Sequence, residues 1–286
     1  MAFRKVLLAV LAHPDDETFG IGGTLALYTK QGVDVFLICA TRGEAGIVEK
    51  KYLEGFDSIA EVREAELRCA AKKLGLQDVI FLGYRDSGMP GSPDNQNPMA
   101  LINAEISDLA QKITCHIRNL KPQVVLTFDE IGGYMHPDHI CVHQATRKAF
   151  YDAANPAVNC DVLPIYQPQK LYYYTISKRI MRWLVRIMPI FGKDPTKYGQ
   201  NGDIDLRSIS KAIYPIHAKI DYTEVADLRA EASYCYASQG GKKVNKGASG
   251  LLRGWSQNSE IFVRDYPAPV KGQVETDLFE GVTGVD

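Results

Sequence analysis

The fold is decided by residues 6–17, VLLAVLAHPDDE, where an apolar run leads directly into a histidine and three carboxylic acids. The apolar run is too short for a typical helix and is unbroken, as in a parallel strand that is buried on both faces. Pro14 suits the first position of a helix, because its fixed φ matches the helix and its missing N–H would have no partner there. We therefore expect a buried strand that leads into a helix.

The polar end of this stretch has two interpretations. His13 and Asp16 are three residues apart, a spacing that places both on one face of a helical turn, where they can bind a metal ion together. Alternatively, Asp15 or Asp16 caps the free N–H groups of the helix. Ionised groups beside a buried strand are unfavourable unless they are paired or bound to a metal. Residues 12–17 alone favour neither interpretation.

Length, composition and charge are those of an ordinary globular protein. The chain has 286 residues, of which 45% are hydrophobic and 23% are charged, and its formal net charge is −1. This charge indicates neither nucleic acid nor an anionic membrane as a partner. We find no signal peptide and no apolar run long enough to span a membrane, so we expect a cytoplasmic protein.

The cysteines show no pattern of a metal or disulfide framework. Six are scattered along the chain without a C-x-x-C pair, and those at 39, 69, 115 and 141 fall in apolar strand or helix patterns. We therefore expect buried free thiols in a reducing compartment and no disulfide framework.

Three more apolar runs of strand length follow the first one, with helical patterns between them. The strands are expected at 33–40, 79–82 and 124–128, and the helices at 24–31, 58–74 and 101–120. Strands that alternate with helices predict a parallel sheet with right-handed crossovers. We expect one α/β domain: a Rossmann-like, mostly parallel sheet flanked by helices over residues 1–155, and an α+β extension over 156–286 that completes the cleft.

A second His-Pro-Asp tripeptide follows the fourth strand, in the stretch GGYMHPDH at 132–139. In a parallel sheet both tripeptides lie at the carboxyl edge, where such sheets bind ligands. Together they offer His13, Asp16 and one of His136 or His139 as three metal ligands with an open position. Nitrogen and carboxylate ligands in such a set suit a catalytic zinc ion.

The chemistry follows from these parts. A zinc ion lowers the pKa of bound water and polarises a carbonyl oxygen. Asp15, which is not used as a ligand, is the adjacent candidate for the general base. The histidine left over, with Tyr134, is positioned to stabilise an oxyanion or to protonate a leaving amine. This arrangement predicts hydrolysis of an amide or an ester.

Four blocks of the sequence resemble signature motifs of the PIG-L/LmbE-like N-deacetylases. They are AHPDDE (12–17), TRGE (41–44), GYRDSG (83–88) and GGYMHPDH (132–139), and the resemblance spans about residues 5–150. It implies a Rossmann-like sheet and a zinc-dependent removal of an acyl group from the nitrogen of an amino sugar, such as an N-acetylglucosaminyl conjugate. The family includes deacetylases of the mycothiol and bacillithiol pathways and mycothiol S-conjugate amidases.

The same resemblance implies roles for single residues. It makes His13, Asp16 and His139 the ligands of one zinc ion per chain, with Fe²⁺ as an alternative metal. It makes Asp15 the general base, assisted by His136 and Tyr134. Arg63, Asp86 and Arg42 are the candidate substrate-binding residues. The chain departs from the family pattern at Tyr236, where relatives often carry a histidine.

The C-terminal half is less informative. We expect a strand at 170–176, helices at 178–188 and 223–237, and a mobile loop at 240–250. The helix at 178–188 is basic and contains Trp183. Such a helix can lie on a membrane surface, but a single short one is more often packed against the core with solvated cations.

The favoured hypothesis is a zinc-dependent N-deacetylase with a small-molecule amino-sugar substrate, as a possible homo-oligomer. The alternatives are an amidase of a thiol S-conjugate, a binding protein for a sugar or nucleotide without catalysis, and a metal-dependent phosphoesterase. The complete set of ligands and base argues against a binding protein. A phosphoesterase usually has more carboxylates, for two metals.

Overall fold

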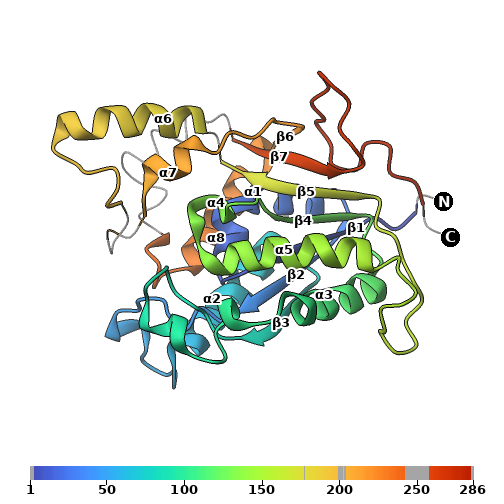
Figure 1. The fold of residues 1–286 in the computed structure, drawn as a ribbon, viewed down its shortest axis with the longest axis horizontal. Helices are drawn as coiled ribbons and strands as arrows, with labels where there is room; N and C mark the ends of the chain where they lie inside the picture. Colours follow the sequence, from blue (N-terminus) through green and yellow to red (C-terminus); the bar gives the residue numbers. More distant parts are fainter. Residues whose placement is uncertain (1–2, 177, 199–201, 203, 242–257, 285–286) are drawn as a thin grey trace.

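The computed structural model describes residues 3–284 except 177, 199–201, 203 and 242–257. One seven-stranded sheet runs through the molecule in the order β3-β2-β1-β4-β5-β7-β6 (Figure 1). The first five strands in the chain are parallel, whereas β7 is antiparallel to both of its neighbours. The strands are β1 (Val6–Leu11), β2 (Asp34–Thr41), β3 (Asp78–Tyr84), β4 (Val124–Phe128), β5 (Lys170–Thr175), β6 (Ala218–Asp221) and β7 (Ser259–Tyr266).

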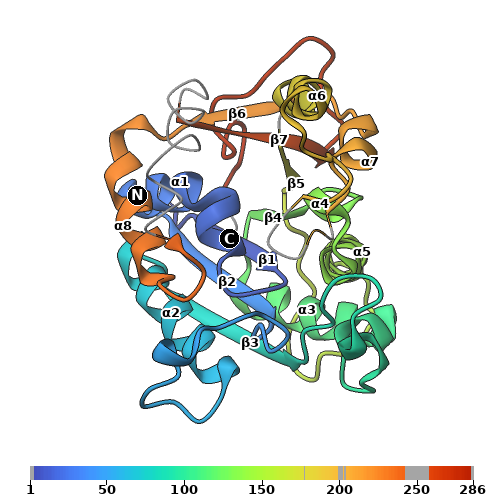
Figure 2. The ribbon, with the colours of Figure 1, turned by 90° about the vertical axis from the view of Figure 1, so that its left-hand side faces the viewer.

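Helices cover both faces of this sheet (Figure 2). The helices α1, α2 and α8 lie on one face, and α3 and α5 lie on the other. The α/β class with a mostly parallel sheet is therefore confirmed. The helices are α1 (Asp16–Lys30), α2 (Ile59–Leu74), α3 (Ile106–Leu120), α4 (Gly132–Met135), α5 (Pro137–Asp152), α6 (Lys178–Ile187), α7 (Leu206–Lys211) and α8 (Ala226–Cys235).

The helix α1 begins eight residues before the expected start, directly at Asp16, and is kinked at Ile21. The glycines around the kink allow other chain segments to approach the helix closely. A Cβ atom at Gly23 would lie 2.2 Å from the ring of Tyr222, so no other residue fits there without a shift of the ring. These glycines therefore allow α1 to pack closely against neighbouring segments such as Tyr222.

The helix α2 begins as its sequence predicts. Ser58 precedes it, and its side-chain oxygen accepts a hydrogen bond of 3.2 Å from the backbone N–H of Glu61. The helix α3 begins five residues later than expected, because a short 3₁₀ turn, Leu101–Asn103, occupies the predicted start.

The C-terminal half continues the same sheet. The strand at β5 was expected, but β6 and β7 were not. Glu260 on β7 is buried and reaches α1, where its carboxylate accepts hydrogen bonds from the backbone N–H groups of Gly23 (3.0 Å) and Thr24 (2.7 Å). These groups follow the kink at Ile21 and open the second half of α1, so Glu260 acts as a cap for it. The extension thus completes an element of the N-terminal half.

The expectation of free thiols is wrong for four of the cysteines. Disulfides join Cys69 on α2 to Cys235 at the end of α8, and Cys115 on α3 to Cys160. Tertiary packing brings the partners together from 166 and 45 residues apart, a proximity that the spacing of cysteines does not encode. Cys39 and Cys141 are free, as expected.

The basic helix α6 also differs from its prediction. The side chain of Trp183 is 58% exposed, so it is not part of a packed core. No helix among the described residues has the length and apolar character needed to cross a membrane. The loop expected at 240–250 lies outside the described residues, apart from its first two positions.

A buried cluster of charges ties the C-terminal segment to β5. Oε1 of Glu275 lies 2.6 Å from both Lys170 Nζ and Arg264 Nη1, and its Oε2 accepts a hydrogen bond of 2.5 Å from the hydroxyl of Tyr172. All four side chains are buried. Glu275 is therefore the only carboxylate among the described residues that is in contact with these two buried cations.

We expect Glu275→Ala to lower the free energy of unfolding by about 3–5 kcal/mol, because it leaves Lys170 and Arg264 buried without a counter-charge. Urea denaturation followed by circular dichroism measures this change. The control is Glu54→Ala, which removes an exposed carboxylate and should change the free energy by less than about 0.5 kcal/mol. Equal values for the two variants would contradict the importance of the cluster.

Candidate active site

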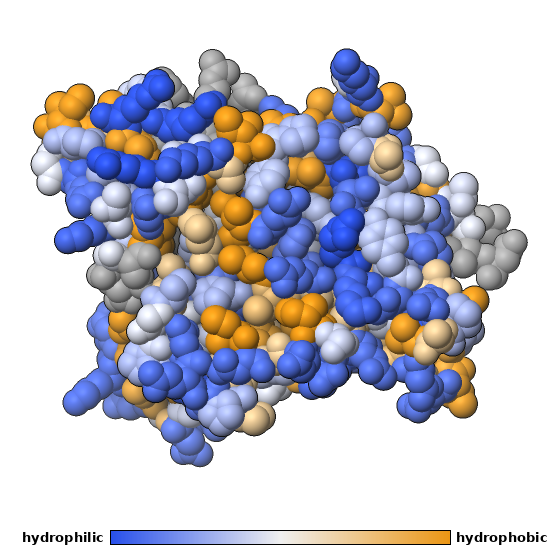
Figure 3. Space-filling view, in the orientation of Figure 1, coloured by the Kyte–Doolittle hydropathy of each residue, from blue (hydrophilic) through white to orange (hydrophobic). Residues whose placement is uncertain are grey.

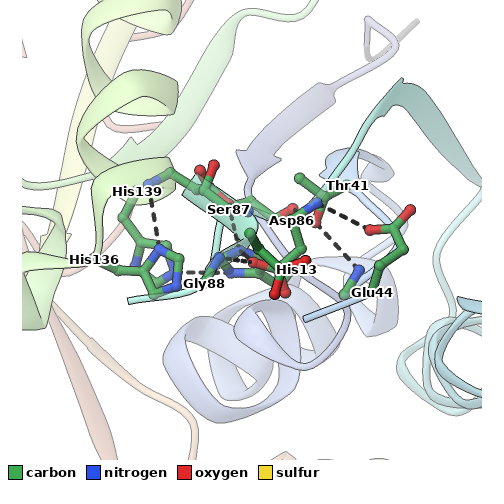
Figure 4. A network of polar contacts seen from close by, with 12 residues as sticks. His13, Thr41, Glu44, Asp86, Ser87, Gly88, His136 and His139 are labelled. Atoms are coloured by element: carbon green, nitrogen blue, oxygen red, sulfur yellow. Dashed lines mark hydrogen bonds and ion pairs between the residues drawn. The ribbon is translucent and has the colours of Figure 1, made fainter. Parts of the chain in front are cut away.

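The two His-Pro-Asp tripeptides meet at the carboxyl edge of the sheet. His13 follows β1, and His136 and His139 lie at the start of α5, which follows β4. Figure 4 shows the rings of the three histidines close together, with Asp86 from the loop after β3 beside His13. The ring centroid of His13 lies 4.5 Å from that of His136 and 5.1 Å from that of His139.

Ligand atoms of three residues, His13, His139 and Asp16, lie at the distances of a metal site. His13 Nδ1 lies 3.1 Å from His139 Nε2. The carboxylate oxygens of Asp16 lie 3.5 Å from the first and 3.4 Å from the second of these nitrogens. Two ligands of a tetrahedral zinc ion, with bonds of about 2.1 Å, are about 3.4 Å apart. The residues present therefore fit a metal ion.

The far nitrogens of the two rings have oxygen partners. His13 Nε2 lies 3.0 Å from Asp138 Oδ2 and 3.3 Å from Asp86 Oδ1. His139 Nδ1 donates to the carbonyl oxygen of Gly132 at 3.1 Å. Metal-binding histidines nearly always have such a partner, which fixes the tautomer and the ring orientation. These contacts leave His13 Nδ1 and His139 Nε2 as the nitrogens that point into the cluster.

Asp138 belongs to this arrangement although we did not single it out from the sequence. It is fully buried, and its Oδ2 also accepts a hydrogen bond of 2.9 Å from the backbone N–H of Ser87. It thereby joins the loop after β3 to α5. The sequence signal for this residue was the repeated His-Pro-Asp tripeptide, because Asp138 is the aspartate of the second copy.

The histidines and carboxylates of the cluster favour each other's charged forms. Burial alone would lower the pKa of His13, but Asp86 and hydrogen bonds to three carboxylates outweigh it and raise this pKa well above its ordinary value. The pKa of Asp16 is lowered well below its ordinary value, because His139 and His13 outweigh the burial that would raise it. The cluster thus favours an ionised Asp16, which is the form that binds metals.

His136 has a different environment. Its Nδ1 accepts a hydrogen bond of 3.2 Å from the backbone N–H of Asp138, so that in the neutral ring the proton is on Nε2. Burial and the positive charges of His13 and His139 lower the pKa of His136 to about 2. His136 is therefore a neutral hydrogen-bond donor.

Asp15 adopts a backbone conformation that is unusual for a residue other than glycine, with φ of 108°. Two neighbours hold it. Its backbone N–H donates to Glu17 Oε2 at 3.0 Å, and Arg63 Nη2 donates to its Oδ2 at 3.1 Å and also to the carbonyl oxygen of Pro14. Burial raises the pKa of Asp15 to about 6, against the lowering effect of Arg63.

Tyr236 completes the support of Asp15 from the C-terminal half. It is fully buried, and its hydroxyl donates to Glu17 Oε1 at 2.7 Å. Glu17 in turn holds the backbone of Asp15. The departure from the family's histidine at this position therefore replaces one hydrogen-bonding side chain by another.

We expect Tyr236→Phe to lower the free energy of unfolding by about 1–3 kcal/mol, because the buried carboxyl of Glu17 loses a donor. Chemical denaturation measures this loss. Tyr234→Phe is the matched control, since Tyr234 lies in the last turn of α8, two residues before Tyr236, and is exposed. If Tyr236→Phe leaves the free energy of unfolding unchanged, the hydroxyl does not stabilise the protein through Glu17.

A cavity of about 560 Å³ opens beside the cluster. Of the candidate residues, Asp86, Tyr134 and His136 line it. Arg63 is buried behind Asp15, and Arg42 forms an ion pair of 2.8 Å with Glu64 on α2, so that neither lines the cavity. The remaining wall is formed by Ala45, Gly46, Ile47, Gly88, Met89, Pro90, Gly91, Ser92, Ile204 and Gln239.

The fold and the site define an α/β enzyme with a cluster of histidines and carboxylates that can bind a metal beside a substrate-sized cavity. Comparisons with known proteins narrow this class. Residues 8–150 match the family described as PIG-L, GlcNAc-PI de-N-acetylase. The chain belongs to this PIG-L family of hydrolytic N-deacetylases.

Two curated relatives are similar over almost their whole length. The protein from Thermobifida fusca is 39% identical over 290 residues, covering 96% of this chain and 98% of that protein. The protein from Geodermatophilus obscurus is 33% identical over 299 residues, covering 99% and 100%. Each is named 1D-myo-inositol 2-acetamido-2-deoxy-alpha-D-glucopyranoside deacetylase.

The fold also matches solved structures. N,N'-diacetylchitobiose deacetylase from Pyrococcus horikoshii has a TM-score of 0.61 and 20% identity, and the match covers 91% of this chain and 83% of that one. The fold resemblance therefore extends through the C-terminal half, beyond the residues matched by the family.

Proposed function

We propose that this chain removes the acetyl group from the nitrogen of an N-acetylglucosaminyl conjugate, with a zinc ion bound by His13, Asp16 and His139. The observation that carries the proposal is the close spacing of buried ligand atoms of His13, His139 and Asp16, with Asp15 as the neighbouring residue in the chain. The names of the two curated relatives support the substrate class, because both describe deacetylases of a 2-acetamido sugar.

A zinc ion held there would supply a water of lowered pKa and would polarise the carbonyl oxygen of the amide. Asp15, whose pKa of about 6 leaves it mostly ionised at neutral pH, would accept a proton from the water while the water oxygen forms a bond to the acetyl carbon. The Nε2–H of His136 and the hydroxyl of Tyr134 donate to the oxygen on which negative charge develops. Asp15 then passes its proton to the nitrogen as the C–N bond breaks, which yields acetate and a primary amine.

Substrate binding is assigned by position. Asp86 lines the cavity and carries a carboxylate that can accept hydrogen bonds from sugar hydroxyls. Arg63 contacts Asp15, so we propose that it orients the base. The role of Arg42 in substrate binding stays a prediction from the sequence. We also propose that residues 1–155 carry out catalysis and that 156–286 select the substrate, because Ile204 and Gln239 line the cavity from this half.

A panel of N-acetylated sugars tests this function. Zinc-loaded protein should release acetate and a primary amine from an N-acetylglucosamine–inositol conjugate faster than from free N-acetylglucosamine. Acetate is measured by an enzyme-coupled assay, and the amine by reaction with a fluorogenic reagent. If zinc-loaded and iron-loaded proteins both release no acetate from any member of the panel, the proposal is wrong.

An amidase of thiol S-conjugates is the second candidate, because Ile47, Met89 and Ile204 give the cavity lining an apolar part. The panel therefore includes an S-conjugate of a glucosaminyl thiol. Cleavage of the cysteinyl amide in preference to the acetyl amide would favour the amidase. A homo-oligomer stays a prediction, which light scattering tests.

The cytoplasmic location also stays a prediction, and the two disulfides weigh against it, since the cytosol of most organisms keeps thiols reduced. Alkylation of the native protein in cell extracts, followed by mass spectrometry, decides the point. If four cysteines can be alkylated only after reduction, the protein carries two disulfides and two free thiols.

A further inference from the structure

Exposed apolar side chains are concentrated in one excursion of the chain. Among the described residues, seven of the twenty large apolar side chains that are exposed lie within 176–216, which is about a seventh of the chain. The excursion leaves the sheet at the carboxyl end of β5 and contains α6, the 3₁₀ turn η4 (Met188–Phe191) and α7. Figure 1 shows α6 at the upper left, at the margin of the molecule.

The outer part of this excursion is strongly apolar. Ile190 is 78% exposed and Phe191 is 74% exposed, and Trp183 on α6 is also exposed. Isolated surface leucines or valines need no explanation, but two adjacent and fully projecting apolar side chains beside an exposed tryptophan do. In Figure 3 hydrophobic side chains lie at the outer end of α6, next to strongly hydrophilic ones.

The charge of the same segment is opposite to that of the rest of the chain. Residues 178–198 contain six lysines and arginines and one aspartate, a net charge of +5, which leaves −6 for all other residues. Arg182 and Arg186 on α6 and Lys193 after η4 are exposed. The small total charge therefore hides a basic segment. We call Arg182, Trp183, Arg186, Ile190, Phe191 and Lys193 the docking face.

We propose that the docking face binds the surface of a bilayer that contains anionic phospholipids. A basic amphipathic helix followed by projecting apolar side chains is the arrangement of interfacial helices, whose apolar groups enter the boundary between headgroups and acyl chains while the cations contact anionic headgroups. The helix is too short to cross the bilayer, so the attachment is peripheral.

A second copy of the chain is a poorer occupant. A two-fold interface would place the docking face against itself, and the cations of one copy would then face those of the other.

Co-sedimentation with lipid vesicles tests the proposal. The full chain should sediment with vesicles of phosphatidylglycerol and phosphatidylcholine and remain in solution with phosphatidylcholine alone. Arg182→Gln with Arg186→Gln should weaken the partition about 25-fold, since each cation near an anionic surface contributes about fivefold. Ile190→Ser with Phe191→Ser should abolish sedimentation at the same lipid concentration.

The matched control is Val162→Ser with Val270→Ser, which removes two apolar side chains that are 96% and 59% exposed outside the docking face and should sediment like the unaltered chain. Circular dichroism checks that all variants are folded. The proposal is overturned if the unaltered chain does not sediment with anionic vesicles, or if the Ile190→Ser, Phe191→Ser variant still sediments with them. It is also overturned if light scattering shows a dimer that these substitutions dissociate and that does not bind vesicles.

Discussion

Asp15→Asn should lower kcat about 10²–10⁴-fold, the usual contribution of a general base, and leave the metal content unchanged. The amide has the size of the carboxyl but cannot accept a proton from water. Asparagine is also the substitution that the backbone permits, because φ at this position is 108° and asparagine tolerates positive φ better than alanine does. A loss of activity is then a loss of the carboxylate and not of local structure.

The control for this variant is Asp161→Asn. Asp161 has a φ of 53°, is exposed and lies outside the cluster, so that its replacement should leave kcat unchanged. Steady-state kinetics with the N-acetylglucosaminyl conjugate measures both variants, and inductively coupled plasma mass spectrometry measures their zinc. An Asp15→Asn variant that keeps most of its activity would remove Asp15 from the role of base.

His139→Ala should lose both bound zinc and activity, because it removes one of the three proposed ligands and the other two cannot hold the ion alone. His136→Ala should keep the metal and lose rate, because His136 Nδ1 is hydrogen-bonded to the backbone of Asp138 and the ring acts as a donor. The two variants therefore separate the interpretations that the sequence left open.

His116→Ala is the control, since His116 lies on α3 away from the cluster. It should keep zinc and activity. Full zinc occupancy in His139→Ala, together with loss of zinc in His136→Ala, would exchange the two histidines in the proposed mechanism.

Much of the parallel part of the fold could be predicted, because its signals are local. The strands β1 and β4 have the predicted bounds, since an unbroken apolar run can be buried on both faces only in the middle of a sheet. The two His-Pro-Asp tripeptides come together at one edge as predicted, because parallel strands place their carboxyl ends side by side.

The strand β7 could not be found in the same way. Its buried face carries Glu260, Phe262 and Arg264, whereas Ile261 and Val263 are only partly buried. The alternation of apolar and polar residues is therefore the reverse of what a buried face predicts. Both charges have partners outside the strand, since Glu260 caps α1, which is remote in sequence, and Arg264 pairs with Glu275.

The structural roles of Asp138 and Glu17, and the two disulfides, were missed for a related reason. Each depends on a contact between segments far apart in the chain, such as the hydroxyl of Tyr236 on Glu17. Such contacts become visible only when the tertiary structure is known.

The cap that Glu260 provides for α1 has a consequence for the order in which the enzyme is completed. A ribosome has made every proposed metal ligand once it has passed His139, yet the N–H groups of Gly23 and Thr24 have no cap until Glu260 has left the exit tunnel. The helix that begins with Asp16 is thus finished only long after its own residues have been translated. Completion of the active centre therefore depends on a residue that is made well after every proposed metal ligand.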